Sequence, residues 1–478
     1  MTTTRDNYKE HLSSIPWDFL PRTFQDAVLV ARALGVRFIW IDSLCIIQDD
    51  GEDWAREASM MAGIYENAWL TIAATAAVDG RQGLFTDRSG NEKAQISYCG
   101  SPVLLRPVVD HSEFIAYTEK PSRSLPLLWR GWGLQEQILS TRVLHFTQEE
   151  LLWECRSEMS CECSPEASGG SLREIGQSLG AARSVWGRHP AETGANMRDW
   201  YKLVEVYMKR DLTYDSDRLP ALSGIANAFQ RTLVGPGRYL AGLWESDLIR
   251  GLLWRVDRPR PRGPSYKTAL SSPPSWSWAS IGQCSIYWPV GTPKGIHVAE
   301  VIDASCTRST VDDKGMVSGG KLTLRGKLIP LKIQYVVGKE LEVAEPWWHS
   351  YTTDPVDDRF WRSCRLAQDE CFMPDVQLSP PGENLPPGSV LYFLPLVKVP
   401  HWVPSMYTRG LLAQGIFVRQ LPEWSTPSED EERGPGHISS PLFARVGCGA
   451  LDFLAPTRGT LDPFARLGEY GDTIVTIV

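Results

Sequence analysis

The chain has 478 residues, of which 42% are hydrophobic and 22% charged, and its formal net charge is -8. This length favours two or three domains, and the composition is typical of folded proteins rather than of disordered chains or coiled coils. Without a basic stripe, an N-terminal signal or an apolar run near 18 residues, we expect a cytoplasmic protein with no nucleic-acid partner and no membrane span.

The first predicted helix covers residues 24–34. Its apolar side chains recur at helical spacing, Thr23 and Asp26 resemble a capping box, and Gly35 supplies a stop. The apolar run 36–41 comes directly after it and predicts a strand that is largely buried in a parallel sheet.

A second amphipathic pattern, residues 54–65, predicts another helix, and the apolar run 69–74 predicts a second strand. Strand, helix and strand in this order predict a right-handed crossover and an open α/β sheet. Shorter patterns predict further strands at 103–109, 143–146 and 151–155, and a helix at 131–139.

The rest of the chain changes character twice. Residues 164–180 are rich in glycine and serine. Helical patterns at 197–209 and 222–233 follow. Short apolar runs between prolines and glycines then predict a mainly β region, with strands among them at 322–329, 390–397 and 474–477 and a surface loop at 424–436. We therefore predict three parts: a first domain over 1–165, a linker and helical connector over 166–235, and a β-rich region over 236–478.

Several long motifs stand in a fixed order along the chain. Together they resemble the fungal heterokaryon incompatibility (HET) domain family, and they cover somewhat more than half of the chain. The motifs are LPRTFQDAVLVARALGVRFIWIDSLCIIQDD (20–50), DW (53–54), M-x2-IY-x2-A (61–68), GLFTDR (83–88), RGWGLQEQILSTRVLHF (130–146), LLWEC (151–155), YKLVEVYMKRDLTYDSDRLPALSGIA (201–226) and PSWSWAS (274–280).

The resemblance implies a role in non-self recognition and programmed cell death, with self-association or protein partners as the expected mode of action. HET domains are more distantly similar to TIR domains, which implies an open, mainly parallel sheet. Family members usually begin with a strand resembling LSYxWG, and Met1 falls inside that neighbourhood. We therefore expect a sheet that lacks its usual first strand and exposes an edge, either because the true start lies upstream or because the chain is truncated.

TIR domains that cleave NAD carry a helix that begins with a motif like W-C-x-x-E, whose glutamate acts on the ribose. The local match runs from Trp132 to Glu136, so the resemblance implies Glu136 as the catalytic residue and NAD as the substrate. An aromatic ring four residues before a carboxyl lies on the same helix face and can raise its pKa by desolvation. The competing interpretation is a solvated glutamate and a core tryptophan, in a non-catalytic adaptor or an inactive paralogue.

Binding candidates follow the predicted strand 36–41, at the edge where open α/β sheets hold ligands. Asp42 and Ser43 are the candidates on the ligand side, although Asp42 equally fits a side-chain cap of the turn. Arg88 and Arg130 are candidates for a pyrophosphate contact, and the alternative for both is a surface ion pair. Residues 48–50 line the same edge or cap the next helix.

We expect no metal site. The ten cysteines are scattered, and only Cys155, Cys161 and Cys163, with His145 upstream, form a group. Their C-x5-C-x-C spacing lacks the paired knuckles of zinc sites, which favours reduced structural thiols. The 19 tryptophans, WSW at 276–278 among them, are interpreted as core and interface rather than carbohydrate-stacking residues.

Overall fold

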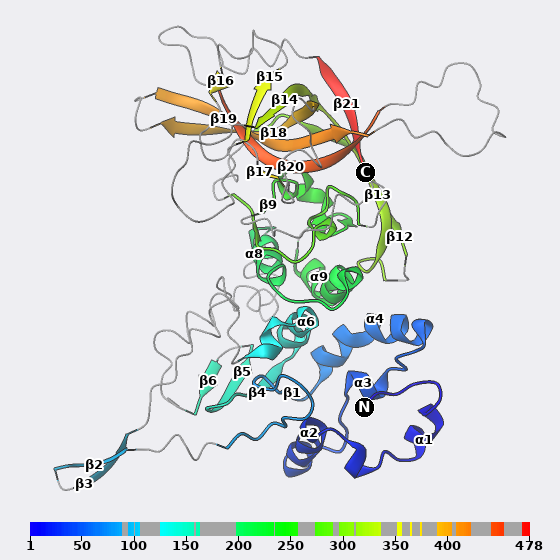
Figure 1. The fold of residues 1–478 in the computed structure, drawn as a ribbon, viewed down its shortest axis with the longest axis vertical. Coiled ribbons are helices and arrows are strands. Elements are labelled where there is room, and N and C mark those ends of the chain that lie inside the picture. The colour runs from blue at the N-terminus through cyan, green and yellow to red at the C-terminus, as the bar shows by residue number, and fades with distance from the viewer. Residues whose placement is uncertain are drawn as a thin grey trace. The chain divides into compact units, whose positions relative to one another are not determined.

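The structure is a computed structural model of residues 1–478. It describes residues 1–87, 94–99, 101–105, 125–156, 159–162, 197–233, 235–256, 273–289, 296–309, 312–335, 351–355, 364–365, 373–374, 390–403, 408–421, 441–453 and 471–478. The chain divides into two compact units, Met1–Val234 and Gly235–Val478 (Figure 1). The predicted three-part division, with its boundaries at 165 and 235, stays a prediction.

The N-terminal unit mixes helices and strands, as predicted. Its helices are α1 (Tyr8–Ser13), η1 (Trp17–Phe19), α2 (Arg22–Ala33), α3 (Asp42–Cys45), α4 (Gly51–Asn67), η2 (Pro126–Trp129), α6 (Gly131–Leu139), α8 (Met197–Tyr207), η3 (Asp215–Arg218) and α9 (Pro220–Thr232). Its strands are β1 (Thr71–Ala73), β2 (Ala94–Tyr98), β3 (Ser101–Leu105), β4 (Arg142–Phe146), β5 (Leu151–Cys155) and β6 (Met159–Cys161).

The main sheet of this unit has the order β1-β4-β5-β6. The pairing of β1 with β4 is parallel, whereas β4–β5 and β5–β6 are antiparallel. The expectation of a mainly parallel sheet therefore holds only at the β1–β4 pair. The reason is local, because β4 and β5 are joined by a short turn that only antiparallel neighbours can share.

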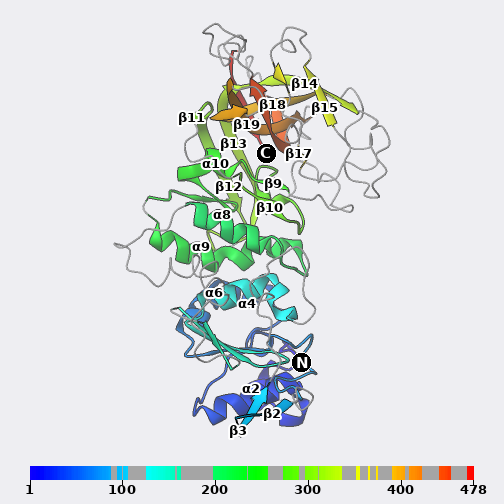
Figure 2. The same ribbon diagram turned by 90° about the vertical axis from the view of Figure 1, so that its left-hand side faces the viewer.

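Both faces of this sheet are covered by helices (Figures 1 and 2). On one face, Ala27 of α2 and Phe146 of β4 belong to an apolar cluster against which Ile72 packs. On the other face, Gln137 of α6 reaches a carboxylate of β5. Because successive side chains of a strand point to opposite faces, β4 contributes to both layers.

The predicted capping box at the start of α2 is wrong. Pro21 holds the cap position, and no side chain caps the helix. Instead, Asp26 is buried and its carboxylate accepts the Leu84 N–H at 2.8 Å, while the Thr23 hydroxyl accepts the Gly83 N–H at 3.2 Å. The two side chains therefore fasten the loop of the GLFTDR motif onto α2, a long-range contact that local spacing does not reveal.

The predicted strand at 36–41 is also wrong. This segment leads from α2 to α3, and the backbone groups of residues 37–40 form no hydrogen bond within the described part of the chain. A strand exists only when its backbone pairs with a neighbour. On the side facing β1 (Thr71–Ala73) the segment borders a cavity instead of another strand.

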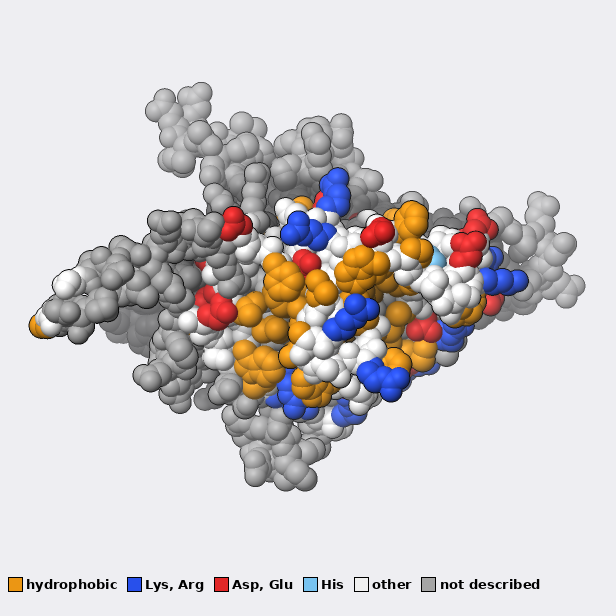
Figure 3. Space-filling model, turned by 90° about the horizontal axis from the view of Figure 1, so that it is seen from below, with side chains coloured by type: hydrophobic (Ala, Val, Ile, Leu, Met, Phe, Trp, Pro, Cys, Tyr) orange, Lys and Arg blue, Asp and Glu red, His pale blue; other side chains and the backbone are white. Residues whose placement is uncertain are grey.

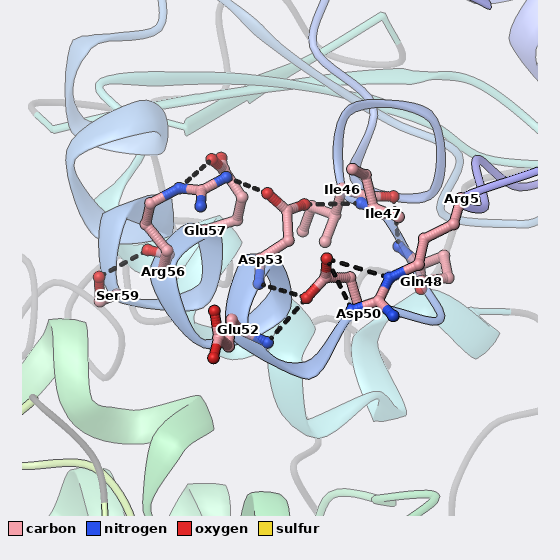
Figure 4. Close-up of polar contacts among 10 residues, drawn as sticks. All are labelled: Arg5, Ile46, Ile47, Gln48, Asp50, Glu52, Asp53, Arg56, Glu57 and Ser59. Carbon is pink, nitrogen blue, oxygen red and sulfur yellow. Dashed lines mark hydrogen bonds and ion pairs between the residues drawn. The ribbon is translucent and has the colours of Figure 1, made fainter. Parts of the chain in front are cut away.

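Asp50 is the N-cap of α4 (Figure 4). Its carboxylate accepts the N–H groups of Glu52 and Asp53 at 3.0 and 3.2 Å, and Arg5 pairs with it at 3.0 Å. Asp53 in turn accepts the Ile47 N–H at 2.8 Å. These bonds support the capping interpretation of residues 48–50, and hydrogen bonding to the carboxylate lowers the Asp50 pKa.

The C-terminal unit is rich in β structure, as predicted. Its main sheet has eleven strands in the order β12-β13-β21-β20-β19-β18-β14-β15, with β11 paired to β18 and β16 and β17 paired to β20, and it is nearly closed. The elements are β7 (Tyr239–Leu240), β8 (Leu243–Trp244), η4 (Glu245–Asp247), α10 (Leu248–Gly251), β9 (Arg255–Val256), η5 (Trp278–Ser280), β10 (Ile286–Tyr287), β11 (Ile296–His297), β12 (Glu300–Arg308), β13 (Val317–Lys327), β14 (Ile329–Tyr335), β15 (Tyr351–Pro355), β16 (Cys364–Arg365), β17 (Met373–Pro374), β18 (Val390–Val403), β19 (Thr408–Gln420), β20 (Leu442–Phe453) and β21 (Asp472–Ile477). The predicted loop at 424–436 lies outside the described residues.

The WSW motif belongs to the core of this unit. Trp276 and Trp278 are fully buried, and the Trp278 indole donates to the Gly242 carbonyl at 3.0 Å. The Trp254 indole donates to the Trp276 carbonyl at 3.2 Å, and the Arg445 guanidinium lies 3.4 Å from the centre of the Trp254 ring. These contacts confirm the interpretation as core. Within the described residues, no helix is long and apolar enough to cross a membrane.

Candidate functional site

A cavity of about 590 Å³ lies in the N-terminal unit beside β1. Residues 36, 38–42 and 67–74 line it, together with residues of α2, α4 and α6. Since α2 covers one face of the sheet and α6 the other, the cavity passes through the layer that the sheet occupies. Its volume is that of a ligand pocket or of a short stretch of chain.

Glu136 of α6 is half-buried in the wall of this cavity. Burial raises the pKa of its carboxyl, and the nearby Asp42 charge acts in the same direction. The charges of Arg130 and Arg210 and a hydrogen bond from Tyr65 oppose this increase only in part. Glu136 is thus a carboxyl that keeps its proton to a higher pH than an exposed glutamate does.

Tyr65 of α4 is the neighbour of Glu136 that the sequence did not single out. Its hydroxyl bonds the Glu136 carboxylate, and its ring meets Trp40 edge-on with 5.8 Å between centroids. Burial, followed by the charges of Glu136 and Asp42, raises the Tyr65 pKa well above its ordinary value. The helical pattern predicted only that Tyr65 lies on the buried face of the helix. Nothing in the local sequence indicated that its hydroxyl contacts Glu136.

Asp42 and Ser43 begin the one-turn helix α3. Asp42 is exposed, lines the cavity and accepts the Ser43 N–H at 2.7 Å, so it both faces the cavity and fixes the turn. Ser43 is not among the described lining residues. Its carbonyl accepts the Thr3 N–H at 2.9 Å, which ties the N-terminal residues to α3. Asp42 is therefore the better placed of the two for a ligand.

Trp132 points elsewhere than Glu136. Its indole donates to Asp217 at 3.1 Å, and its ring meets Trp54 edge-on with 6.3 Å between centroids. It is absent from the described lining of the cavity. These contacts are those of a packing residue, and ring stacking by Trp132 stays a prediction without a contact to support it.

Arg130 immediately precedes α6 and is exposed. Its charge acts on both Glu136 and Tyr65, so the structure brings it near the two candidate groups. Its carbonyl lies 3.5 Å from an Arg210 guanidinium nitrogen, which helps to hold the start of the helix. Arg88 lies outside the described residues, and its phosphate role stays a prediction.

A buried polar network lies behind the cavity. The two ring nitrogens of His145 lie 2.9 Å from the Thr75 hydroxyl and 2.8 Å from the Glu154 carboxylate. The same carboxylate accepts from the Gln137 amide at 3.0 Å. Both ring nitrogens of His145 therefore have an oxygen partner, and Cys161 is buried on β6. Cys163 lies outside the described residues.

The cavity has the groups for acid–base work. Glu136 and Asp42 are the two carboxyl groups among its described lining residues, and no cluster of potential metal ligands occurs in the described part of the chain. A carboxyl with a raised pKa beside a second carboxyl can exchange a proton with a bound molecule, and its ionised form can stabilise a developing positive charge.

The N-terminal unit is an α/β unit with a cavity beside β1 that is lined by carboxyl groups. This cavity is the candidate functional site. Residues 2–136 match the family model described as Heterokaryon incompatibility protein (HET). Residues 2–136 are therefore assigned to a HET domain, and the match includes Asp42, Tyr65 and Glu136. A search of curated proteins and a search of solved structures each gave no match.

Proposed function

We propose that this chain acts in fungal non-self recognition and programmed cell death, as a cytoplasmic protein whose HET domain works by self-association. The family match over residues 2–136 carries this proposal. The finer features of the domain, a TIR-like sheet and its extent over 1–165, belong to the same proposal, as do protein rather than nucleic-acid partners.

The surface of the N-terminal unit supports an associating role. Figure 3 shows hydrophobic side chains gathered on one face, with Lys and Arg side chains among them. Large apolar side chains that group on a surface mark interaction sites more often than isolated ones do. The exposed large hydrophobic residues described in this unit are Met1, Tyr8, Leu12, Trp17, Phe19, Leu29, Leu34, Phe38, Ile39, Met60, Trp69, Val78, Phe85 and Tyr214.

Regulated expression of the full chain in a fungal host tests this function. We expect growth arrest and loss of viability on induction. The matched control is Leu134→Asp, which places a charge at a fully buried position of α6 and should unfold the domain. Viability that is equally high for both proteins at equal abundance would remove the cell-death function.

A second candidate function is NAD cleavage at Glu136. The observation that favours it is the meeting of Glu136, Tyr65 and Asp42 around one cavity, although they come from three different helices, with the Arg130 charge acting on Glu136 and Tyr65. In this reaction the bond between the ribose and nicotinamide breaks, water supplies a hydroxyl to the ribose, and nicotinamide, ADP-ribose and a proton are released. Glu136 would stabilise the oxocarbenium-like ribose, and Arg130 would face the pyrophosphate.

Nicotinamide release from NAD by the purified full chain tests the second candidate. Glu136→Gln keeps the size and polarity of the side chain but cannot ionise, so it should abolish turnover. Glu149→Gln removes a carboxylate from an exposed turn between β4 and β5 and should leave turnover unchanged. Equal turnover in the two variants would exclude Glu136 as the catalytic residue.

A further inference from the structure

Two unpaired edges of the backbone border the cavity beside β1. On one side, residues 37–40 form no backbone hydrogen bond within the described chain. On the other side, β1 (Thr71–Ala73) pairs along one edge with β4 and with no other strand among the described residues. A strand placed between them would give ladder hydrogen-bond partners to both edges, which a helix cannot do because its backbone groups already bond one another.

The walls of the cavity also specify the side chains of such a strand. Ala27 and Ala31 of α2 line one face, and Ile64 and Leu127 line the cavity as well, so apolar side chains fit both faces. The acidic residues among the mostly apolar described lining are Asp42 and Glu136. The fitting strand is therefore apolar and carries a positive charge at the end that meets Asp42.

Residues 36–41 of a second copy have these properties. The segment reads VRFIWI, with Arg37 as its one charged residue. Phe38 is 82% exposed, so its side chain is available to a partner. The segment lines the cavity, so the two are adjacent, and a surface that holds both a strand and its acceptor is complementary to itself, as a two-fold dimer requires.

We propose that two copies of this chain associate by inserting residues 36–41 of each into the cavity of the other. This inference rests on the proposed self-association and names the surface that carries it. The strands then follow the order β4, β1, the partner's segment, the segment itself, the partner's β1 and the partner's β4. Both cavities are filled, and the two sheets become one continuous sheet.

The direction of pairing agrees with the charges. Two segments related by a two-fold axis run antiparallel, so the Arg37 end of one copy lies beside the Ile41 end of the other. Asp42 follows Ile41 directly. Arg37 of each copy therefore meets the acidic end of the partner's cavity, and this pair forms twice in the dimer.

Sedimentation equilibrium of the full chain, combined with amide hydrogen exchange, tests this arrangement. We expect a dimer whose amides at 37–40 become protected as the protein concentration rises. Phe38→Asp removes no core contact and should weaken dimerisation about tenfold or more. Phe19→Asp is the control, because Phe19 is 73% exposed but is absent from the described lining of the cavity. It should leave the dimer constant within about twofold.

Swapping the charges at positions 37 and 42 gives an independent test. Arg37→Asp alone should weaken the dimer, and the addition of Asp42→Arg should restore it. A dimer that Phe38→Asp leaves intact, or whose amides at 37–40 exchange equally fast at all concentrations, would overturn strand insertion while leaving self-association through another surface. A chain that stays monomeric at every concentration would overturn both.

Discussion

Gly83→Ala should destabilise the N-terminal unit substantially, although it adds a single methyl group. Gly83 has φ +83°, and a Cβ there would lie 2.5 Å from the Asp26 carboxylate and 3.0 Å from Arg22 Cγ. The left-handed backbone costs a non-glycine residue roughly 1–2 kcal/mol. Displacing Asp26 from the Leu84 N–H weakens a hydrogen bond to a charged group worth about 1.5–3 kcal/mol. We expect a loss of roughly 2–4 kcal/mol in the free energy of unfolding, since part of the strain relaxes.

Urea unfolding of the full chain, followed by circular dichroism, measures this loss. The dependence of the free energy of unfolding on urea concentration should stay the same in the variant and the wild type. The control is Gly63→Ala in α4, where a Cβ would have nothing within 4 Å. The control should stabilise by about 0.5–1 kcal/mol, because alanine is the better helix former. If Gly83→Ala changed stability by less than about 0.5 kcal/mol while Gly63→Ala stabilised as expected, the anchoring of the GLFTDR loop on α2 would be refuted.

Three further substitutions test other parts of the N-terminal unit. Thr75→Val leaves a His145 ring nitrogen without its hydroxyl partner and should cost about 1–2 kcal/mol in urea unfolding; an unchanged midpoint would show that the network adds nothing. Glu136→Gln should become more stable than the wild type as pH rises, because a carboxyl with a raised folded-state pKa loses its contribution as pH increases through that pKa. Unfolding at several pH values checks this, and a pH-independent difference would contradict the raised pKa. Asp50→Ala should speed amide exchange at Glu52 and Asp53, which its carboxylate caps, and unchanged rates would contradict the cap.

Elements with a strong local pattern were predictable from the sequence. The helix predicted at 131–139 is α6, and the strand predicted at 151–155 is β5, with the same bounds. In both elements the residues that the sequence pattern predicts to be buried are largely the ones that pack against the rest of the unit. The segment 36–41 shows the limit of this reasoning, because its apolar residues have the composition of a strand but pairing depends on a neighbour elsewhere in space.

The candidate site was predictable only in part. Asp42 and Glu136 were singled out from their positions after a predicted strand and in a helical motif, and the structure places both in one cavity. Tyr65 was missed, because its hydroxyl meets Glu136 only when α4 and α6 pack together. Trp132 was expected beside Glu136, but its contacts with Trp54 and Asp217 are set by other segments of the chain. Sequence spacing along one helix does not reveal which face a third element will cover.

The most direct test of function by self-association is the viability of a fungal host that expresses the wild type, Phe38→Asp or Glu136→Gln at equal levels. We predict that the wild type and Glu136→Gln kill, whereas Phe38→Asp does not, because association and not the carboxyl carries the effect. Killing that persists in Phe38→Asp and disappears in Glu136→Gln would contradict self-association through residues 36–41 and transfer the function to the chemistry of the cavity.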